Sequence, residues 1–131
     1  MPDHDRAHVE FLELRSERLA DGLRAVLAEA GADLVICART KDALEATASE
    51  IRKATGVNVT AVACDITTDA GRAEVLAACP EPDILINNAG VGAIGTFAAA
   101  DPDRLLRILK INFVAPVKLI RSTFTMLRED N

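Results

Sequence analysis

The chain has 131 residues, half of them hydrophobic, and a formal net charge of −5 at pH 7. That length suits one domain, and the composition supports a hydrophobic core rather than a disordered chain. The acidic balance gives no indication of a nucleic-acid partner or of an anionic membrane surface. No apolar stretch approaches the roughly 20 residues of a membrane span, and the acidic N-terminus has no apolar signal core, so we expect no membrane partner and a cytoplasmic location.

The N-terminal part of the chain carries an amphipathic helical pattern over residues 7–30. Apolar or small side chains recur there at spacings of three and four residues, as on one face of a helix. The members of this face are Val9, Leu12, Ser16, Leu19, Leu23, Val26 and Ala30. On pattern alone, this segment is expected to form a single helix.

From Ala32 onward, short apolar runs alternate with helical patterns. The predicted strands are Asp33–Cys37, Val57–Val62 and Asp83–Asn87. The predicted helices are Lys41–Ala54, closed by Gly56, then Asp69–Ala78, ended by Pro80 and Pro82, and a long helix from the Asp101 N-cap and Pro102 to about Arg128. Strands separated by helices of about ten residues or more indicate right-handed β-α-β crossovers and an α/β fold with a doubly wound parallel sheet.

The cysteines and histidines do not indicate a metal site or a disulfide framework. Cys37, Cys64 and Cys79 are odd in number and lack C-x-x-C spacing, so we expect small buried thiols. His4 and His8 are the chain's two histidines and have no paired cysteine nearby, so no metal is expected.

Four pieces of the sequence, in their order and spacing, resemble the short-chain dehydrogenase/reductase family. They span roughly residues 20–126 and are Leu27–Ala32 running into Leu34–Arg39, then Cys64-Asp65-Ile66, then Asn87-Asn88-Ala89-Gly90, and finally Asn112. The resemblance implies a Rossmann-like fold and an oxidoreductase that transfers hydride between a nicotinamide dinucleotide and a carbonyl or alcohol substrate. Family members are longer than this chain, so the chain is expected to be a partial dinucleotide-binding domain over residues 1–131, atypical over residues 1–20 and without the catalytic half.

The resemblance and the sheet topology predict one cofactor crevice. Ligands of doubly wound sheets bind beyond the carboxyl ends of the strands, and the polar pieces follow such ends. The expected cofactor-binding residues are Arg39, Asp65, Ile66, Asn88, Ala89 and Gly90. Arg39 stands where an acidic residue would favour NAD, and an arginine can instead pair with the 2′-phosphate, so NADP is expected and NAD less so.

The resemblance assigns the separate residues of this crevice distinct roles, each with a plainer alternative. Asp65 would accept a hydrogen bond from the adenine amino group, and Ile66 would lie beside the ring. Alternatively, Asp65 could be a turn or helix-cap residue, and Arg39 could be a solvated charge on a loop. Asn88, Ala89 and Gly90 would border the cofactor, with Gly90 allowing close backbone approach. The match of residues 90–95 to G-x-G-x-x-G is rejected as the dinucleotide fingerprint, because no helix opens directly after it.

Asn112 is the candidate catalytic residue that the resemblance carries over. Pro116 has no N–H, so the Asn112 carbonyl loses its helical partner, and we expect a kink with a free acceptor there. In the family the matching carbonyl holds a water in the proton relay. The alternative is a proline-kinked packing helix with a solvent-facing asparagine.

Two parts of the family's machinery are absent from this sequence. Counting back from Gly31 places the T-G-x-x-x-G-x-G phosphate turn at Glu13–Ala20, where its glycine positions hold Leu14, Arg18 and Ala20. The chain has no tyrosine, and therefore no Tyr-x-x-x-Lys to donate a proton. We therefore expect a truncated or disrupted copy, inactive alone. The family topology also requires a central first strand, so we predict a strand over His8–Glu13 in place of helix.

Two other functions stay open at this point. The helix around residues 102–128 has more apolar surface than one sheet face needs, which favours a homo-oligomer or a non-catalytic assembly or regulatory module that pairs with a full-length relative. A Rossmann-like domain for another nucleotide is the third hypothesis, because the phosphate turn is missing. The small-molecule substrate cannot be predicted from these residues.

Overall fold

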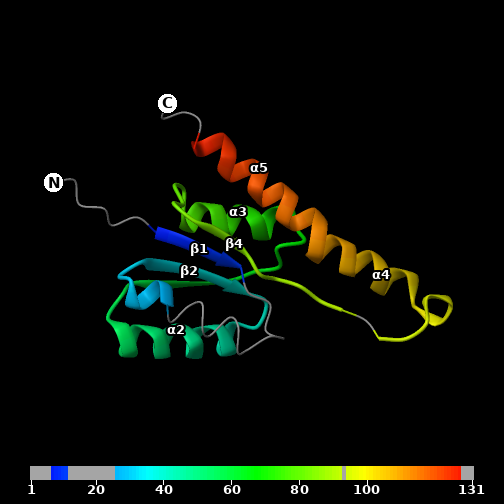
Figure 1. Cartoon of the computed structure of the whole chain (residues 1–131), viewed down its shortest axis with the longest axis horizontal. Helices are drawn as coiled ribbons and strands as arrows, with labels where there is room; N and C mark the ends of the chain where they lie inside the picture. The colour runs from blue at the N-terminus through cyan, green and yellow to red at the C-terminus, as the bar shows by residue number, and fades with distance from the viewer. Residues whose placement is uncertain (1–6, 12–25, 93, 128–131) are drawn as a thin grey trace.

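The protein is an α/β structure built on a four-stranded parallel sheet (Figure 1). The computed structural model describes residues 7–11, 26–92 and 94–127. The strand order is β3-β2-β1-β4, and the strands are β1 (Ala7–Phe11), β2 (Asp33–Ala38), β3 (Val59–Ala63) and β4 (Leu85–Asn87). This arrangement confirms the α/β fold with a parallel sheet that the alternating pattern predicts.

The first strand is the point at which the local pattern is misleading. The single helix expected over residues 7–30 is wrong at Ala7–Phe11, which form the strand that the family topology requires. In this strand Val9 is paired with Val35 of β2 and with Leu85 of β4. A helix there would leave both neighbours with unpaired edges, so pairing on two sides outweighs helical periodicity. Residues 26–29 are helical, as the pattern predicts, and the phosphate-turn positions Glu13–Ala20 lie outside the described residues.

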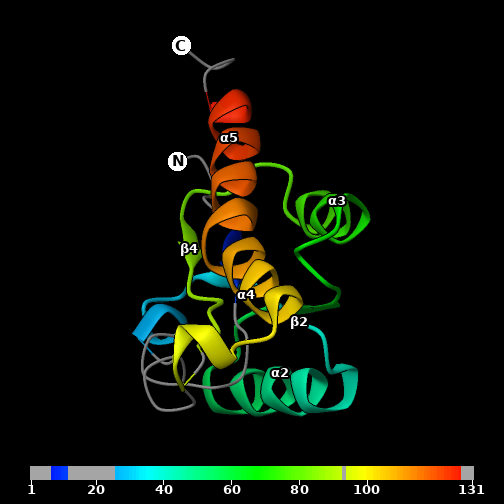
Figure 2. The same cartoon turned by 90° about the vertical axis from the view of Figure 1, so that its right-hand side faces the viewer.

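Helices cover both faces of the sheet, as Figures 1 and 2 show. They are α2 (Lys41–Thr55), α3 (Asp69–Ala78), α4 (Pro102–Leu109) and α5 (Ala115–Leu127), with a 3₁₀ turn at Phe97–Ala99. Helix α2 lies on one face, and α3 lies with the long α4–α5 helix on the other (Figure 1). Of the described helices, none has the length and apolar character needed to cross a membrane.

The helix ends carry recognisable capping residues. Helix α2 ends at Gly56, whose φ of 74° is left-handed and whose N–H donates to the carbonyl of Arg52. Helix α3 begins after Thr68, whose side chain accepts from the N–H of Gly71, and α4 begins after Asp101 with Pro102 in its first turn.

Strand β2 lies at the centre of the core because both of its faces are covered. Leu34 and Ile36 pack in the cluster that contains α2 residues Leu44 and Ala48. Val35 and Cys37 point to the other face, into a cluster with Val75, Ala115 and Leu119. This two-sided burial explains why β2 reads as a continuous apolar run rather than an alternating one.

The long C-terminal helix is interrupted in its middle. Between α4 and α5, residues Lys110–Val114 form a π-helical segment, in which the N–H of Ala115 donates to the carbonyl of Lys110. Pro116 has no N–H to give to the Asn112 carbonyl, so the local loss of α-helical bonding was predictable, although the structure takes the form of a π segment. The helix as a whole runs on continuously across it (Figure 1).

Candidate functional site

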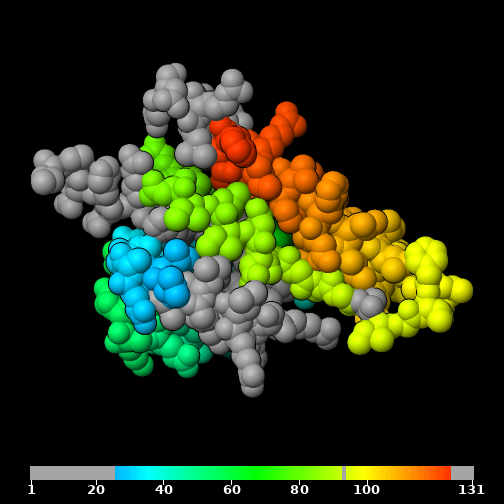
Figure 3. Space-filling view, in the orientation of Figure 1, coloured from blue at the N-terminus to red at the C-terminus, as the bar shows by residue number. Residues whose placement is uncertain are grey.

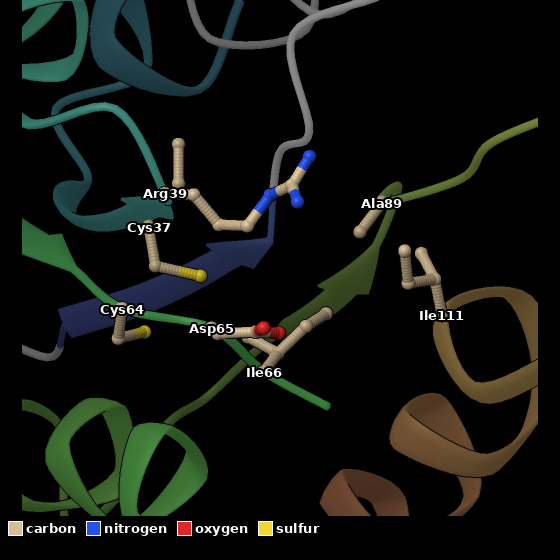
Figure 4. Close-up of a pocket in the computed structure, with 8 residues that line it drawn as sticks. Cys37, Arg39, Cys64, Asp65, Ile66, Ala89 and Ile111 are labelled. Atoms are coloured by element: carbon tan, nitrogen blue, oxygen red, sulfur yellow. The ribbon is translucent and has the colours of Figure 1, made fainter. Parts of the chain in front are cut away.

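An open hollow lies at the carboxyl edge of the sheet (Figure 4). Its walls are formed by Cys37, Ala38, Arg39, Cys64, Asp65, Ile66, Ala89 and Ile111. Four of the residues predicted to bind the cofactor, Arg39, Asp65, Ile66 and Ala89, therefore lie on one hollow. They converge because each follows the end of β2, β3 or β4, and parallel strands end at the same edge.

The hollow combines one cation and one carboxylate with mainly apolar walls. Arg39 is the first residue after β2 and is exposed, and Figure 4 shows its side chain and the Asp65 carboxylate on the same hollow. Ala89 and Ile111 face them from the side of β4 and the π segment (Figure 4). These side chains suit a dinucleotide, because a cation can pair with its phosphate, a carboxylate can accept a hydrogen bond from its base, and apolar side chains can pack against its rings.

Asp65 belongs to a tight polar turn that joins β3 to α3. Its Oδ1 accepts from the backbone N–H of Thr67 at 3.0 Å and from the Thr67 hydroxyl at 2.7 Å. Its backbone carbonyl accepts from the Thr68 hydroxyl at 2.8 Å and from the Thr68 N–H at 3.1 Å. The turn interpretation of Asp65 and the binding-site interpretation are thus compatible, since one carboxylate oxygen makes the turn while the residue lines the hollow.

A buried arginine of α3 is hydrogen-bonded to this turn. Arg72 is 6% exposed, and its Nη1 donates to the carbonyl of Ile66 at 2.7 Å. Its Nη2 pairs with Asp69, whose carboxylate also meets the Lys118 ammonium of α5 at 3.4 Å. The buried Arg72 holds the turn against α3, whereas the Asp69–Lys118 pair between α3 and α5 joins exposed side chains and adds little stability.

The carboxylate of Asp65 is held in its ionised form. Burial raises its pKa, but the two Thr67 hydrogen bonds and the charges of Arg107 and Arg39 act in the opposite direction, and the net pKa is lowered. The Arg107 guanidinium on α4 is 3.8 Å from Oδ2. At neutral pH Asp65 is therefore an acceptor without a proton of its own.

None of the three cysteines forms a disulfide; Cys37 and Cys79 are buried, Cys64 is half-buried, and Cys37 and Cys64 line the hollow. A hydrogen bond from the Cys37 side chain lowers the pKa of Cys64, against burial and against the charges of Glu74 and Asp65. Burial and the charge of Asp83 raise the pKa of Cys79, which lies in the core. Among the described residues, no group of three or more histidine, cysteine or acidic side chains is placed to hold a metal.

Asn112 connects the π segment to the loop after β4. Its Oδ1 accepts from the N–H of Val91 at 2.9 Å, and its Nδ2 donates to the carbonyl of Val91 at 2.8 Å. This side chain is therefore engaged with the loop. A Cβ at Gly90 would lie 3.5 Å from Asn112 Oδ1, an ordinary contact. Asn88 and Gly90 are not in the wall of the hollow, and their cofactor contacts stay predictions.

Several residues of the site were not predicted from the sequence. Thr67 could have been found, because Asp-x-Thr after a strand is typical of an Asx turn. Ile111 and Arg107 could not have been predicted, because the rotation of the α4–α5 helix against the sheet determines which face of this helix lies at the hollow. Cys37 and Cys64 were predicted as buried thiols, because no local sequence pattern distinguishes a core residue from a residue that lines a pocket.

Known proteins resemble this chain in both sequence and structure. The family model described as short chain dehydrogenase matches residues 19–131. The bovine (Bos taurus) dehydrogenase/reductase SDR family member 7B is 37% identical over 103 residues, which are 71% of this chain and 31% of that protein.

Solved structures with similar folds include an alcohol dehydrogenase specific for bulky-bulky ketones from Comamonas testosteroni, at 27% identity and a TM-score of 0.82 over 94% of this chain and 50% of that one. L-sorbose reductase from Gluconobacter frateurii, in complex with NADPH and L-sorbose, also has 27% identity and a TM-score of 0.82, over 95% of this chain and 49% of that one. The chain thus spans about a third to a half of the length of these relatives. With its parallel sheet, its crevice at the strand ends and a family match over most of its length, the chain belongs to the short-chain dehydrogenase/reductase family.

Proposed function

We propose that the hollow binds the adenosine end of NADP(H), in an oxidoreductase that transfers hydride between this cofactor and a carbonyl or alcohol. The observation that carries the proposal is the placement of Arg39 and the ionised Asp65 on one hollow with apolar walls. Arginine binds phosphate through a planar fork of donors, and no acidic residue stands at the end of β2 to accept a ribose 2′-hydroxyl. The NADPH in the related L-sorbose reductase structure supports the same cofactor.

The residues of the hollow fit the chemical groups of this ligand. Arg39 would hold the 2′-phosphate, and Asp65 would accept from the adenine amino group. Ile66 and Ala89 would pack against the ring, while Asn88 and Gly90 would border the cofactor beyond β4. The bound cofactor would supply the hydride, and the protein residues described here would bind and orient it.

The reaction also needs a proton donor, which these 131 residues do not supply as a tyrosine. Asn112 would serve the proton relay through its backbone carbonyl, with its side chain held by Val91. We therefore expect cofactor binding but no turnover from this stretch of chain by itself. Measurable NADPH-dependent carbonyl reduction by the pure chain would contradict this expectation. A cytoplasmic location stays a prediction.

The cofactor assignment is tested by titrating the protein with NADPH and with NADH and comparing the two dissociation constants. Arg39→Ala should weaken NADPH binding about tenfold or more, the size of a charged hydrogen bond, and should leave NADH binding nearly unchanged. Arg104→Ala, at an exposed arginine of α4, is the matched control and should change neither. Equal affinity for both dinucleotides, or an Arg39→Ala variant that binds NADPH like the unmodified protein, would contradict the proposal.

A second candidate function is association through the α4–α5 helix. Its inner side is buried at Ile111, Ala115 and Leu119, whereas large apolar side chains on its outer side are 39–65% exposed. The outer residues follow helical spacing and are Leu106, Leu109, Phe113, Val117, Ile120 and Phe124. The helix forms the outer ridge of the molecule in Figure 3. An exposed apolar stripe of this kind is typical of a subunit interface.

We propose that this stripe pairs two copies of the chain, or one copy with a longer relative. Analytical ultracentrifugation of the protein and of Phe113→Ser tests the proposal, since the substitution removes a large exposed apolar side chain. Concentration-dependent association that the substitution weakens is expected. A protein that stays monomeric and does not bind a longer relative would contradict association as a function.

A further inference from the structure

Two of the three cysteines lie on neighbouring strands at the carboxyl edge of the sheet. Strands β2 and β3 are paired in parallel, with Cys37 opposite Val62. The N–H of Cys64 donates to the carbonyl of Ala38 at 3.0 Å, which extends the pairing one residue beyond β3. Because side chains alternate along a strand, Cys64, two residues after Val62, lies on the same face of the sheet as Cys37. Both thiols pack in the same core cluster.

The hollow gives small solutes access to one of these thiols. Cys37 and Cys64 both line it, and Figure 4 shows both sulfur atoms directed toward the hollow. Cys64 is half-buried, whereas Cys37 is only 2% exposed. The Cys37 side chain is hydrogen-bonded to Cys64, so a change at the Cys64 sulfur takes place within reach of the second thiol.

The third cysteine has neither of these properties. Cys79 follows the last residue of α3, which places it about 15 Å along the helix from the Asp65 turn. It is 1% exposed and is not part of the wall of the hollow. The direction of its pKa agrees with the geometry, because burial raises the pKa of Cys79, whereas the Cys37 hydrogen bond lowers that of Cys64, and the thiolate is the reactive form.

We propose that Cys37 and Cys64 form a thiol oxidation site, at which hydrogen peroxide converts the pair to a disulfide that joins β2 to β3 beside the hollow. This site goes beyond the proposed function, since its chemistry needs no dinucleotide. A disulfide requires Cα atoms within about 6.8 Å, and paired strands lie about 4.8 Å apart. Cys64 follows the last residue of β3, so it can move toward Cys37 without breaking that strand.

The oxidation takes place in two steps. The Cys64 thiolate attacks one oxygen of hydrogen peroxide: the S–O bond forms, the O–O bond breaks, and the departing hydroxide takes the proton that the Cys64 thiol released. The Cys37 sulfur then attacks the Cys64 sulfenic acid, so that the S–S bond forms, the S–O bond breaks and a second water leaves with the Cys37 proton. Two thiols thus lose two electrons and two protons, and one peroxide is reduced to two waters.

The test is peptide mapping of the folded protein after brief treatment with hydrogen peroxide and alkylation of the remaining thiols. Tryptic cleavage after Arg39 and Arg72 leaves the three cysteines on separate peptides. The map should contain two peptides joined through Cys37 and Cys64, an alkylated Cys79, and no joined peptides after a dithiol reductant. Cys64 should lose its thiol about tenfold faster than Cys79, or more, the difference that one unit of pKa makes in thiolate content.

The same treatment in urea is the control for proximity in the fold. Fewer residues separate Cys64 from Cys79 than from Cys37, so in the unfolded chain the shorter loop favours a Cys64–Cys79 bond. A Cys37–Cys64 bond should therefore dominate only in the folded protein. Cys79→Ser is the matched variant that should keep this bond, whereas Cys37→Ser should leave Cys64 to be oxidised to sulfinic acid.

The map of the unmodified protein decides the outcome even if a variant fails to fold. Equal oxidation rates of Cys64 and Cys79 would overturn the proposal. So would conversion of Cys64 to sulfinic acid while Cys37 keeps its thiol, or an absence of reaction in the folded protein.

Discussion

Gly71→Ala should destabilise the protein, although the same change inside a helix ordinarily stabilises it. Gly71 lies in the first turn of α3, where alanine is favoured over glycine by about 1 kcal/mol. A Cβ at this position would, however, overlap the carbonyl oxygen of Asp65 and lie 2.7 Å from its carbonyl carbon. These are backbone atoms of the bonded turn, so they cannot move aside as a flexible side chain would.

The overlap should outweigh the gain in helix propensity. Overpacking of a well-packed site costs about 1–3 kcal/mol, and overlap with backbone atoms places this site at the upper end. After subtraction of the propensity term, the free energy of unfolding should fall by about 2 kcal/mol. For a chain of this size that corresponds to a decrease in melting temperature of about 8 °C.

Thermal and urea unfolding followed by circular dichroism measure this change. Gly92→Ala is the control, because a Cβ there meets no atom within 4 Å, and its stability should stay within about 0.5 kcal/mol of the unmodified protein. Because the Asp65 turn must shift, Gly71→Ala should also weaken NADPH binding. A Gly71→Ala protein that is as stable as the control, or more stable, would refute the close packing of α3 against the turn.

Three further predictions follow from single contacts. Thr67→Val should raise the pKa of Asp65 in a carboxyl NMR titration, and an unchanged pKa would argue against the turn. Because the pKa of Asp65 is lowered in the folded state, the ionised carboxylate stabilises the fold above about pH 4, and this effect is lost as the pH falls. The Thr67→Val variant should therefore lose less stability in acid than the unmodified protein. Gly56→Ala should lower the free energy of unfolding by about 1 kcal/mol in urea denaturation, because φ at Gly56 is 74°, and a neutral result would mean that α2 ends differently. Asn112→Ala should lower the free energy of unfolding by about 1 kcal/mol and speed amide exchange at Val91, because the Val91 N–H loses its acceptor. Unchanged exchange would contradict the link between the helix and the loop.

Much of the fold could be predicted because its local and tertiary preferences agree. Helix α3 has the bounds expected from the sequence, Asp69–Ala78, since two prolines follow its helical pattern. Strand β2 was identifiable because burial on both faces leaves an uninterrupted apolar run. Strand β4 begins two residues later than predicted, at Leu85 rather than Asp83, because the pattern marks the apolar run and not the first paired residue.

The parts that could not be predicted depend on contacts distant in sequence. Ala7–Phe11 carry a helical pattern and yet pair with strands on both sides, which no local window contains. In the site, Arg39 and Asp65 were predictable from strand ends alone, because the sheet topology brings those ends together. Arg107 was not, because its position depends on how α4 is rotated against the hollow.

Binding of NADP(H) in the hollow at the strand ends can be tested by mapping the backbone amide chemical shifts of the protein during titration with NADPH. The largest shifts should occur at residues that line the hollow, which include Arg39, Asp65, Ile66, Ala89 and Ile111, and shifts along α2 on the other face of the sheet should be small. An absence of shifts, or shifts confined to the outer stripe of α4 and α5, would contradict the claim and leave association as the better supported function.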